Sequence, residues 1–254
     1  MAAFIDLAGV SKHYGAQAAL DGVGLSVGEG EFVALVGGSG SGKTTLLKTI
    51  NGLIRPDVGQ VAVAGEAIGA TPAHLVRRRI GYVFQEVGLF PHLTVAENIG
   101  VTPRLLGWDR ARIAARVAEL LELVALPRDL AGRPPAALSG GQRQRVGVAR
   151  ALAAEPRLML MDEPFGALDP VTRDALGADY RALHERLGLT TIMVTHDMAE
   201  AVLLADRIVV LKSGRILADG APADLLARSR DPHVRALLEA PKRQAERLRE
   251  RLGA

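Results

Sequence analysis

The nine residues GGSGSGKTT at positions 37–45 constrain the fold of this chain more than any other stretch. They follow the apolar run EFVALV and lead into the start of an amphipathic helix, which gives the order strand, glycine loop, helix. Because glycine lacks a Cβ, such a loop can turn its N–H groups inward around an anion, beside the positively polarised first turn of a helix. Gly37, Gly42, Lys43 and Thr44 match the pattern G-x-x-x-x-G-K-[ST], so the loop is expected to bind a polyphosphate.

Each part of this loop has an expected role. Lys43 is expected to lie as a point charge near the β and γ phosphates, and the Thr44 hydroxyl to complete the coordination shell of Mg²⁺. A flexible Gly/Ser linker is the alternative interpretation, but a linker has no reason to follow a buried-type strand and to end in KTTLL. The other loop residues predicted to contact the nucleotide are Gly37, Gly38, Ser39, Gly40, Ser41, Gly42 and Thr45.

Composition narrows the class of protein. A chain of 254 residues is long enough for one large domain or two small ones. No apolar run approaches the roughly 18 residues that cross a bilayer, and the N-terminal segment does not resemble a signal peptide, so we expect a cytoplasmic location. The absence of cysteine excludes disulfides and thiolate metal sites, and a formal charge of +3 indicates neither nucleic acid nor membrane lipid as a partner.

The order of predicted elements indicates an α/β fold. Short alternating segments before the glycine loop and shortly after it predict antiparallel strands and hairpins. From position 157 onward, strands alternate with helices near 171–187 and 197–205, the signature of a parallel sheet with crossover helices. Between these parts we expect a helical insertion near 86–155. Within it, DRARIAARVAELLELVAL carries Ile113, Val117, Leu120, Leu121 and Val124 at helical spacing, and Pro127 follows as the stop.

Two acids end the strand RLMLMDE. An Asp at the end of such a strand binds Mg²⁺ in many phosphate-binding enzymes, which assigns Asp162 to the metal, and Glu163 could accept the proton of an attacking water. The alternative is that Asp-Glu-Pro only caps the following segment. His196 follows another parallel strand, where open α/β sheets place ligands, although its position alone favours a structural role.

The stretch ALSGGQRQR predicts a second helix start. Ser139 with Gly140 and Gly141 opens a helix and offers a second anion-binding end, without a lysine. A simple helix cap would need only the serine. Because one chain could hardly fold both helix starts onto the same nucleotide, we expect two chains to share it.

With these motifs the sequence resembles the ATP-binding subunit of ABC transporters over nearly its whole length. The glycine loop matches Walker A, LMLMDE matches Walker B, and LSGGQ at 138–142 matches the signature motif. Tyr14 resembles the aromatic residue that stacks on adenine, and Gln85 resembles the Q-loop glutamine. The D-loop corresponds to ALD, which ends at Asp169, and the switch histidine to His196.

The resemblance implies a P-loop NTPase core with a mostly parallel sheet, an N-terminal antiparallel β subdomain and a helical signature subdomain. It implies a domain at 1–240 and a charged tail at 241–254. It also implies a head-to-tail homodimer that holds two ATP molecules with Mg²⁺. Further roles follow by resemblance: Glu163 as general base, His196 positioning the γ-phosphate and the water, Gln85 sensing metal and membrane subunit, Asp162 on the metal, and Ser139, Gly140, Gly141, Gln142 and Asp169 on the nucleotide.

Transport implies further partners. We expect integral membrane permease subunits, an extracytoplasmic substrate-binding protein reached through them, and a peripheral position on the inner face of the membrane. The apolar stretch VGLFPHLTVAENI would form a docking groove with Phe90 as an anchor, or would fill the junction between lobes.

The sequence segments around Gln85 and Glu163 resemble those in the ATP-binding subunits of importers of glycine betaine, choline or carnitine. Importers of amino acids, sulfonates or phosphonates are the alternative. Only 30 residues follow Asp224, so the paired CBS modules of many such relatives are not expected.

Two rival classes remain. A soluble ABC ATPase acting on DNA or ribosomes would need a long coiled-coil insertion or a second cassette. A non-catalytic regulator usually lacks the acid or the histidine, and both are present here.

Overall fold

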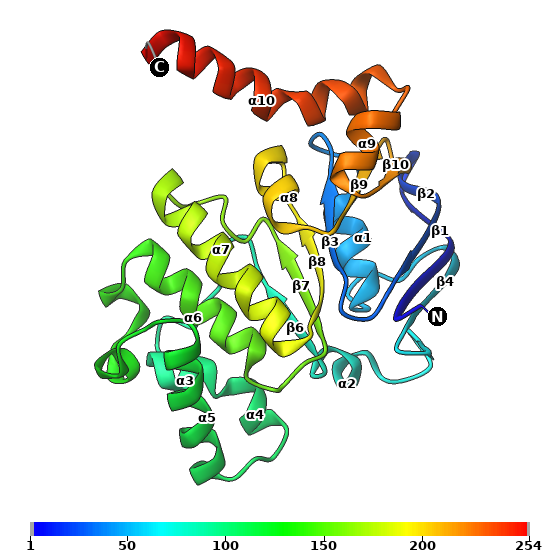
Figure 1. Cartoon of the computed structure of the whole chain (residues 1–254). Coiled ribbons are helices and arrows are strands. Elements are labelled where there is room, and N and C mark those ends of the chain that lie inside the picture. Colours follow the sequence, from blue (N-terminus) through cyan, green and yellow to red (C-terminus); the bar gives the residue numbers. More distant parts are fainter. Residues whose placement is uncertain (1–2, 253–254) are drawn as a thin grey trace.

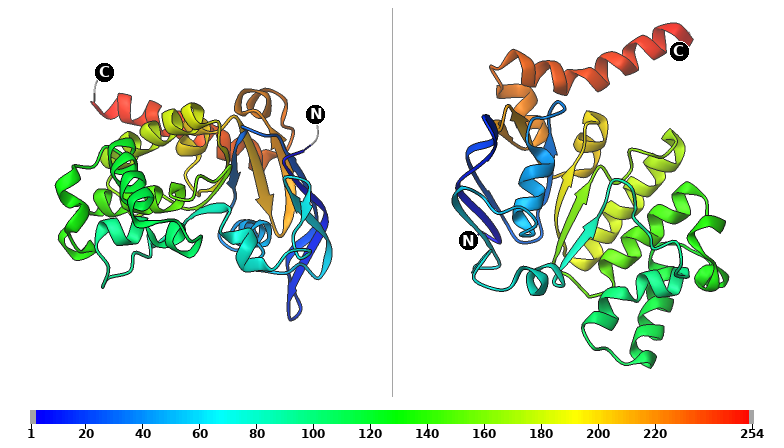
Figure 2. Two further views of the ribbon diagram at one scale, coloured as in Figure 1. Left: turned by 90° about the horizontal axis from the view of Figure 1, so that it is seen from below. Right: turned by 180° about the vertical axis from the view of Figure 1, so that it is seen from behind.

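The structure of the protein is a computed structural model that describes residues 3–252. It contains a four-stranded antiparallel sheet of order β2-β1-β4-β5 and a six-stranded sheet of order β10-β9-β3-β8-β7-β6. The antiparallel sheet lies at one side of the molecule and the helical part at the other (Figures 1 and 2). The strands are β1 (Ile5–Tyr14), β2 (Gln17–Val27), β3 (Phe32–Val36), β4 (Val58–Val63), β5 (Glu66–Ala67), β6 (Ile80–Val83), β7 (Leu158–Asp162), β8 (Thr190–Val194), β9 (Arg207–Lys212) and β10 (Arg215–Gly220).

The six-stranded sheet is covered on both faces. Strands β9, β3, β8, β7 and β6 pair in parallel, and β10 returns antiparallel to β9 through the turn at Ser213 and Gly214. Every residue of β3 is buried, as continuous apolar runs in parallel sheets usually are. Val33 and Leu35 face a core shared with the antiparallel sheet, whereas Phe32, Ala34 and Val36 face a second core.

Helices provide the cover on these two faces. Helix α1 lies between the two sheets, and its Leu46, Leu47 and Ile50 pack into their common core (Figure 1). Helices α6, α7 and α8 contribute to the core on the opposite face. The α-helices are α1 (Lys43–Ile50), α2 (Ala73–Arg77), α3 (Val95–Ile99), α4 (Val101–Leu105), α5 (Arg110–Leu123), α6 (Gly140–Leu152), α7 (Pro170–Leu187), α8 (Met198–Leu204), α9 (Pro222–Arg228) and α10 (Pro232–Leu252).

The helical insertion leaves the sheet between two neighbouring strands. β6 and β7 pair directly in parallel, although α3, α4, α5 and α6 lie between them in the chain. The expected helix with Val117, Leu120 and Leu121 is α5, and these three side chains are buried. Asp109 caps its N-terminus by accepting a hydrogen bond from the Arg112 N–H. The predicted fold class, with a mostly parallel sheet, an antiparallel β part and a helical part, is thereby confirmed.

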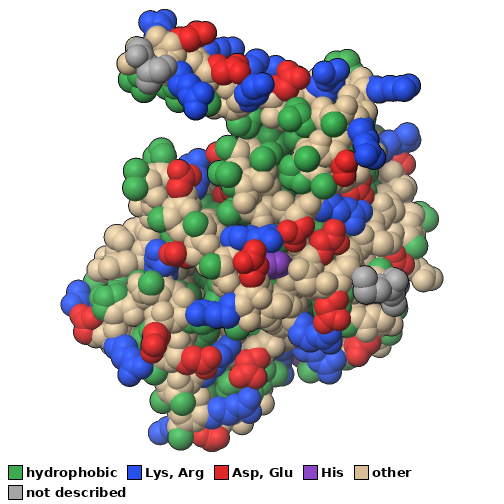
Figure 3. Space-filling view, in the orientation of Figure 1, with side chains coloured by type: hydrophobic (Ala, Val, Ile, Leu, Met, Phe, Trp, Pro, Cys, Tyr) green, Lys and Arg blue, Asp and Glu red, His purple; other side chains and the backbone are tan. Residues whose placement is uncertain are grey.

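Helix α10 projects from the body (Figure 1). Val234 and Leu238 near its start are buried against the core, and hydrophobic side chains gather where it crosses the body, while its distal half is exposed (Figure 3). The helix continues through position 241, where a charged tail was expected to begin, so the boundary at 240 stays a prediction. Within residues 3–252, none of the helices is long and apolar enough to cross a membrane.

Phe32 offers a test of the core that positions β3. Its ring is fully buried and lies edge-on to Tyr180, with centroids 5.9 Å apart. Because Phe32→Ala leaves a cavity and removes an aromatic contact, we expect it to lower the free energy of unfolding by about 3–5 kcal/mol. Urea denaturation followed by circular dichroism measures this change. Phe84, which is 45% exposed, is the control. A loss in Phe84→Ala as large as that in Phe32→Ala would contradict the assignment of the core.

Candidate active site

The glycine loop leaves the end of β3 and enters α1 through backbone conformations that favour glycine. Gly37 has φ of 150° and Gly42 has φ of 105°. A Cβ at Gly37 would lie 2.2 Å from the Leu211 carbonyl oxygen, and one at Gly42 would lie 2.4 Å from the Ala19 carbonyl oxygen. Both positions therefore exclude a side chain for steric as well as conformational reasons.

Lys43 points its ammonium group back into this loop. Its Nζ donates hydrogen bonds to the carbonyl oxygens of Gly37 at 2.8 Å and Gly38 at 2.9 Å, and the residue is buried. Burial lowers the pKa of Lys43, and the carboxylates of Glu163 and Asp162 act in the opposite direction. The geometry holds a cation inside the loop, which suits an anionic ligand. Ser39, Gly40, Ser41 and Thr45 lie in the same loop or in the first turn of α1.

Thr44 and Asp162 meet across the sheet edge. The Thr44 hydroxyl donates to the Asp162 carboxylate at 3.1 Å, although the two residues are far apart in sequence. Burial raises the pKa of Asp162, and the hydrogen bond from Thr44 opposes that shift. A hydroxyl and a carboxylate side by side form the kind of oxygen set that Mg²⁺ uses, because this ion keeps waters and phosphate oxygens as its other ligands. These two residues therefore fit the metal site that the sequence predicts.

The three residues predicted to be catalytic lie together, because Gln85 and His196 both contact the Glu163 carboxylate. Gln85 Nε2 donates to Glu163 Oε2 at 3.2 Å, and His196 Nδ1 lies 3.1 Å from the same oxygen. The φ of Glu163 is 46°, a conformation rare outside glycine, and its N–H donates to the Val194 carbonyl oxygen at 2.9 Å. Strained backbone of this kind is concentrated at functional sites. His196 is exposed, with 65% of its side chain accessible. Because a structural histidine is usually packed inside the protein, this exposure does not favour the structural role that its position suggested.

The signature residues lie apart from the glycine loop. Ser139 caps α6 in a capping box with Gln142: the Ser139 hydroxyl accepts from the Gln142 N–H at 3.2 Å, and Gln142 Oε1 accepts from the Ser139 N–H at 2.9 Å. The simple helix cap, which was the alternative interpretation of this stretch in the sequence, is therefore present. Among residues 3–252, no hydrogen bond joins positions 139–142 to the loop at 37–45.

Asp169 and the signature glycines lie together. Asp169 caps α7 by accepting from the Thr172 N–H at 3.0 Å, and hydrogen bonding from the side chain and the N–H of Thr172 lowers the pKa of Asp169. A Cβ on Gly141 would lie 2.8 Å from the Thr172 methyl carbon, and one on Gly140 would lie 3.8 Å from Leu168. The predicted residues therefore form two groups, one around the glycine loop and Glu163, the other around Ser139 and Asp169.

Tyr14 is separate from both groups. It ends β1 and is 54% exposed, with the Lys12 ammonium 5.8 Å from its ring centroid. An exposed ring at a strand end is free to stack on a planar ligand, so the structure is compatible with the adenine contact that the resemblance implies.

Two side chains near the site were missed at the level of sequence. Arg173 of α7 donates to the Leu168 carbonyl oxygen at 3.0 Å and to the Asp197 carboxylate at 3.4 Å, and so ties the D-loop to the residue after His196. Tyr82 of β6 is half-buried near Asp162, and burial together with this carboxylate raises the pKa of its phenol. No local pattern marks either residue, since Asp197 and Asp162 come from distant segments.

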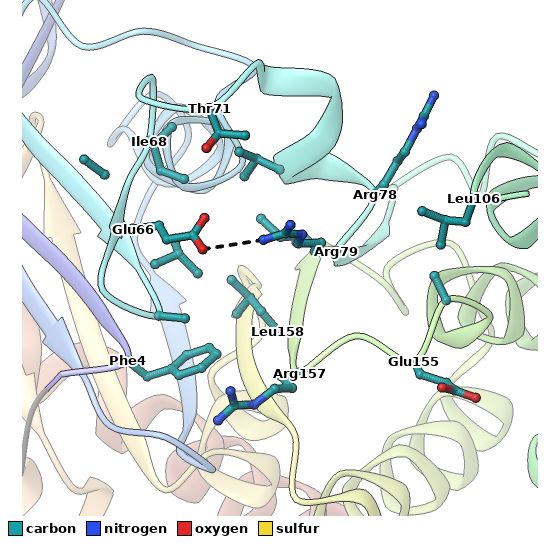
Figure 4. Close-up of a pocket in the computed structure, with 16 residues that line it drawn as sticks. Phe4, Glu66, Ile68, Thr71, Arg78, Arg79, Leu106, Glu155, Arg157 and Leu158 are labelled. Atoms are coloured by element: carbon teal, nitrogen blue, oxygen red, sulfur yellow. Dashed lines mark ion pairs between the residues drawn. The ribbon is translucent and has the colours of Figure 1, made fainter.

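Two neighbouring cavities lie beside the central sheet, and their linings share Arg78, Ile80 and Ala154. A groove of ≈ 890 Å³ extends from Asp162 and Gln85 to Phe90 and Leu53, and includes the active-site edge. A second cavity of ≈ 460 Å³ is formed at the starts of β6 and β7, with Phe4, Ile68 and Leu158 among its lining (Figure 4). It contains none of the predicted site residues, because parallel strands place their starts and ends at opposite edges.

The chain is similar in sequence to known proteins. The sequence family described as ABC transporter matches residues 20–166. The glycine betaine uptake system ATP-binding protein YehX of Escherichia coli K12 is 50% identical over 231 residues, which are 91% of this chain and 75% of that protein. The chain belongs to the ABC transporter ATP-binding family. This ABC cassette thus binds ATP.

Other relatives of the cassette differ in their names. The choline transport ATP-binding protein OpuBA of Bacillus subtilis is 49% identical over 91% of this chain and 61% of its own length. The sulfate/thiosulfate import ATP-binding protein CysA of Bradyrhizobium diazoefficiens is 51% identical over 87% of this chain and 64% of its own length. The chain thus spans less than two thirds of either of these two relatives.

Solved structures of ABC cassettes are also similar. CbiO1 of Clostridium perfringens, described as part of the ABC transporter complex cbiONQ, superposes with a TM-score of 0.83 at 28% identity over 90% of this chain and 92% of its own. The cassette MJ0796, solved as a dimer bound to ADP and Pi, superposes with a TM-score of 0.76 at 36% identity over 85% and 98%. These likenesses confirm the fold of an ABC ATPase for this chain.

Gly42 tests whether the backbone of the loop is required. Gly42→Ala forces a Cβ against the Ala19 carbonyl oxygen at a φ that alanine avoids, a strain of about 1–3 kcal/mol. We expect the dissociation constant of trinitrophenyl-ATP to rise by about tenfold or more, measured by fluorescence titration. Gly132→Ala is the control, because its added Cβ meets nothing within 4 Å. An unchanged affinity in Gly42→Ala would show that the loop does not hold the phosphates.

Proposed function

We propose that this chain hydrolyses Mg·ATP to drive the uptake of quaternary-ammonium osmoprotectants such as glycine betaine, choline or carnitine. The observation that carries the catalytic part is the convergence of Gln85 and His196 on Glu163, next to the Thr44–Asp162 pair. The similarity to YehX and OpuBA supports the transport part.

The roles of the catalytic residues follow from their contacts. Both Gln85 and His196 contact Oε2 of Glu163, so they fix the carboxylate and leave Oε1 to accept a proton from the attacking water. Lys43 supplies a fixed positive charge for the phosphates, and Thr44 with Asp162 holds Mg²⁺, with Gln85 as a further ligand. When bound, Mg²⁺ neutralises charge that develops on the phosphate oxygens.

The second group of residues supports a shared site. Positions 139–142 carry a helix N-terminus without a nearby lysine, and lie apart from the loop of the same copy. We propose that this group completes the ATP site of a second copy, with Ser139 and Gly141 on the γ-phosphate and Gly140, Gln142 and Asp169 beside them. The dimeric form of the relative MJ0796 supports this arrangement.

Coupling to transport requires a membrane partner. The groove beside Gln85 carries exposed Phe84, Phe90 and Leu53, with 43–48% of each residue accessible. We propose that a short helix of a permease subunit docks there, with Phe90 as an anchor, which would place the chain on the inner face of the membrane. An extracytoplasmic binding protein would deliver the solute to that permease.

The proposal about the cargo rests only on sequence similarity to named relatives. Relatives named for glycine betaine, choline and carnitine lie at 49–50% identity, but the sulfate relative CysA lies at 51%. Sequence identity therefore does not separate these cargoes. The osmoprotectant proposal is favoured because several relatives from different bacteria, at 48–50% identity, carry those names.

Glu163→Gln tests the general base. It keeps the size and hydrogen-bonding contacts of the side chain but cannot accept the proton, so turnover should fall roughly 10²- to 10⁴-fold while ATP stays bound. Phosphate release by the assembled complex and retention of labelled ATP measure these two effects. Lys43→Ala is the contrasting variant, because it should lose nucleotide binding itself. Wild-type turnover in Glu163→Gln would rule out Glu163 as the base.

The cargo is tested through the binding protein that co-purifies with the complex. Isothermal titration of that protein with glycine betaine, choline, carnitine, an amino acid, sulfate and a phosphonate should give saturable binding only for the quaternary amines. Stimulation of ATPase activity in reconstituted vesicles by the same ligand provides the second readout. Tight binding of sulfate or an amino acid instead would replace the proposed cargo and leave the ATPase assignment intact.

A further inference from the structure

Arg150, near the end of α6, is a buried charge whose hydrogen bonds go to backbone. Its Nη1 donates to the Gly88 carbonyl oxygen at 2.7 Å, and its Nη2 donates to the Val87 carbonyl oxygen at 2.6 Å. The guanidinium carbon also lies 6.0 Å from the centroid of the Phe90 ring. The residue is 9% exposed, and no salt bridge to it is found among residues 3–252.

Stability alone does not account for this arrangement. Burial lowers the pKa of Arg150, and no neighbouring carboxylate opposes that shift. A buried charge without a counter-ion is costly, and an apolar side chain of similar volume often packs at least as well. What the arginine adds is geometry: its planar fork makes two short, charge-assisted bonds that hold two consecutive peptide groups in one orientation.

The peptide groups that it holds lie between two parts of the molecule. Two residues before Val87, Gln85 contacts Glu163 at the edge of the central sheet. Just after Gly88, the backbone of Phe90 is held by the buried Asn98 of α3, which accepts from the Phe90 N–H at 2.8 Å and donates to its carbonyl oxygen at 3.1 Å. Segment 87–90 is therefore attached to the helical part, whereas Gln85 reaches the catalytic carboxylate.

The chain between Gln85 and segment 87–90 is too short to allow large independent movements. A residue spans at most about 3.6 Å, so the Cα atoms of Val87 and Gln85 cannot lie more than about 7 Å apart. The same helix that ends near Arg150 begins at Ser139, the cap of the signature segment. A shift of α6 as a rigid body would therefore pull on Gln85 through Arg150.

We infer that Arg150 is a positioning residue that couples the signature helix α6 to Gln85, and through it to Glu163. The inference rests on the proposed function, in which Gln85 and Glu163 act on ATP. Arg150 does not touch the nucleotide site itself. Its role is to keep segment 87–90 in step with α6, so that the catalytic carboxylate is held only when the signature helix is in place.

Arg150→Met tests the coupling, because it keeps the apolar length of the side chain and removes both donors. In the full chain we expect amide hydrogen exchange of segment 84–90 to become about tenfold faster, and kcat for Mg·ATP in the assembled complex to fall about tenfold. The KM for ATP and the affinity for trinitrophenyl-ATP should change less than about twofold, because the phosphate loop is untouched. Arg150→Lys, with a single point donor, should fall between wild type and Arg150→Met, and replaces the latter if it does not fold.

Arg145→Met is the matched control. Arg145 lies on the same helix and also donates to a backbone carbonyl, that of Val124, at 2.8 Å, as well as to the Asp179 carboxylate. Its loss should leave exchange of segment 84–90 unchanged. The exchange readout needs no hydrolysis, so it tests the tie even if the proposed ATPase function fails.

A covalent bond can replace the arginine. A Cβ built on Gly147 of α6 lies 3.9 Å from the Val87 Cβ, within the range of about 3.5–4.5 Å that a disulfide spans. The chain has no cysteine, so Val87→Cys with Gly147→Cys would form one defined bridge. In the Arg150→Met background, the oxidised protein should regain at least half of the lost kcat and exchange protection, and dithiothreitol should abolish that gain.

The results separate a positioning role from a structural one. Faster exchange confined to segment 84–90, a fall in kcat without a rise in KM, and rescue by the bridge would support the coupling. Unchanged exchange in Arg150→Met, an equal loss in Arg145→Met, or no rescue by a bridge that demonstrably forms would overturn it.

Discussion

The parallel ladder that joins β3, β8 and β7 determines where the glycine loop, Glu163 and His196 lie. Parallel strands begin at one edge of a sheet and end at the other, and the three segments that follow these strands carry Lys43, His196 and Glu163. Hydrogen bonding therefore gathers a cation, an imidazole and a carboxylate from distant parts of the chain. The continuous apolar composition of these strands keeps the ladder buried on both faces and so holds the site on a rigid base.

Polar groups placed on this base are held by contacts rather than by burial alone. The Thr44–Asp162 pair and the two contacts on Glu163 are each near 3.1 Å, and each links residues from different elements. The second group, around Ser139 and Asp169, is organised by helix caps instead. This separation supports the proposed site shared between two copies, because within residues 3–252 the second group makes no hydrogen bond to the glycine loop of its own copy.

Besides the apolar core, polar side chains link the helical part and the loops of the site. Arg150 and Asn98 hold the backbone after Gln85, and Arg173 ties the D-loop to the segment after His196. Such contacts cost desolvation and contribute orientation. They connect the residues that we propose to act on ATP to the surface groove that we propose as the docking site of a membrane partner.

The sequence by itself determined the fold class, the glycine loop, the helix start at Ser139, and the family. These features are local: glycine spacing, cap residues and apolar periodicity depend on neighbours within a few positions. Only the tertiary structure decided that His196 contacts Glu163 and that α10 continues through position 241. It also decided that Arg150 binds the Gly88 backbone carbonyl and Arg173 the Asp197 carboxylate. An arginine carries no local sign of its partner, because contacts between distant segments exist only once the sheet and helices have packed.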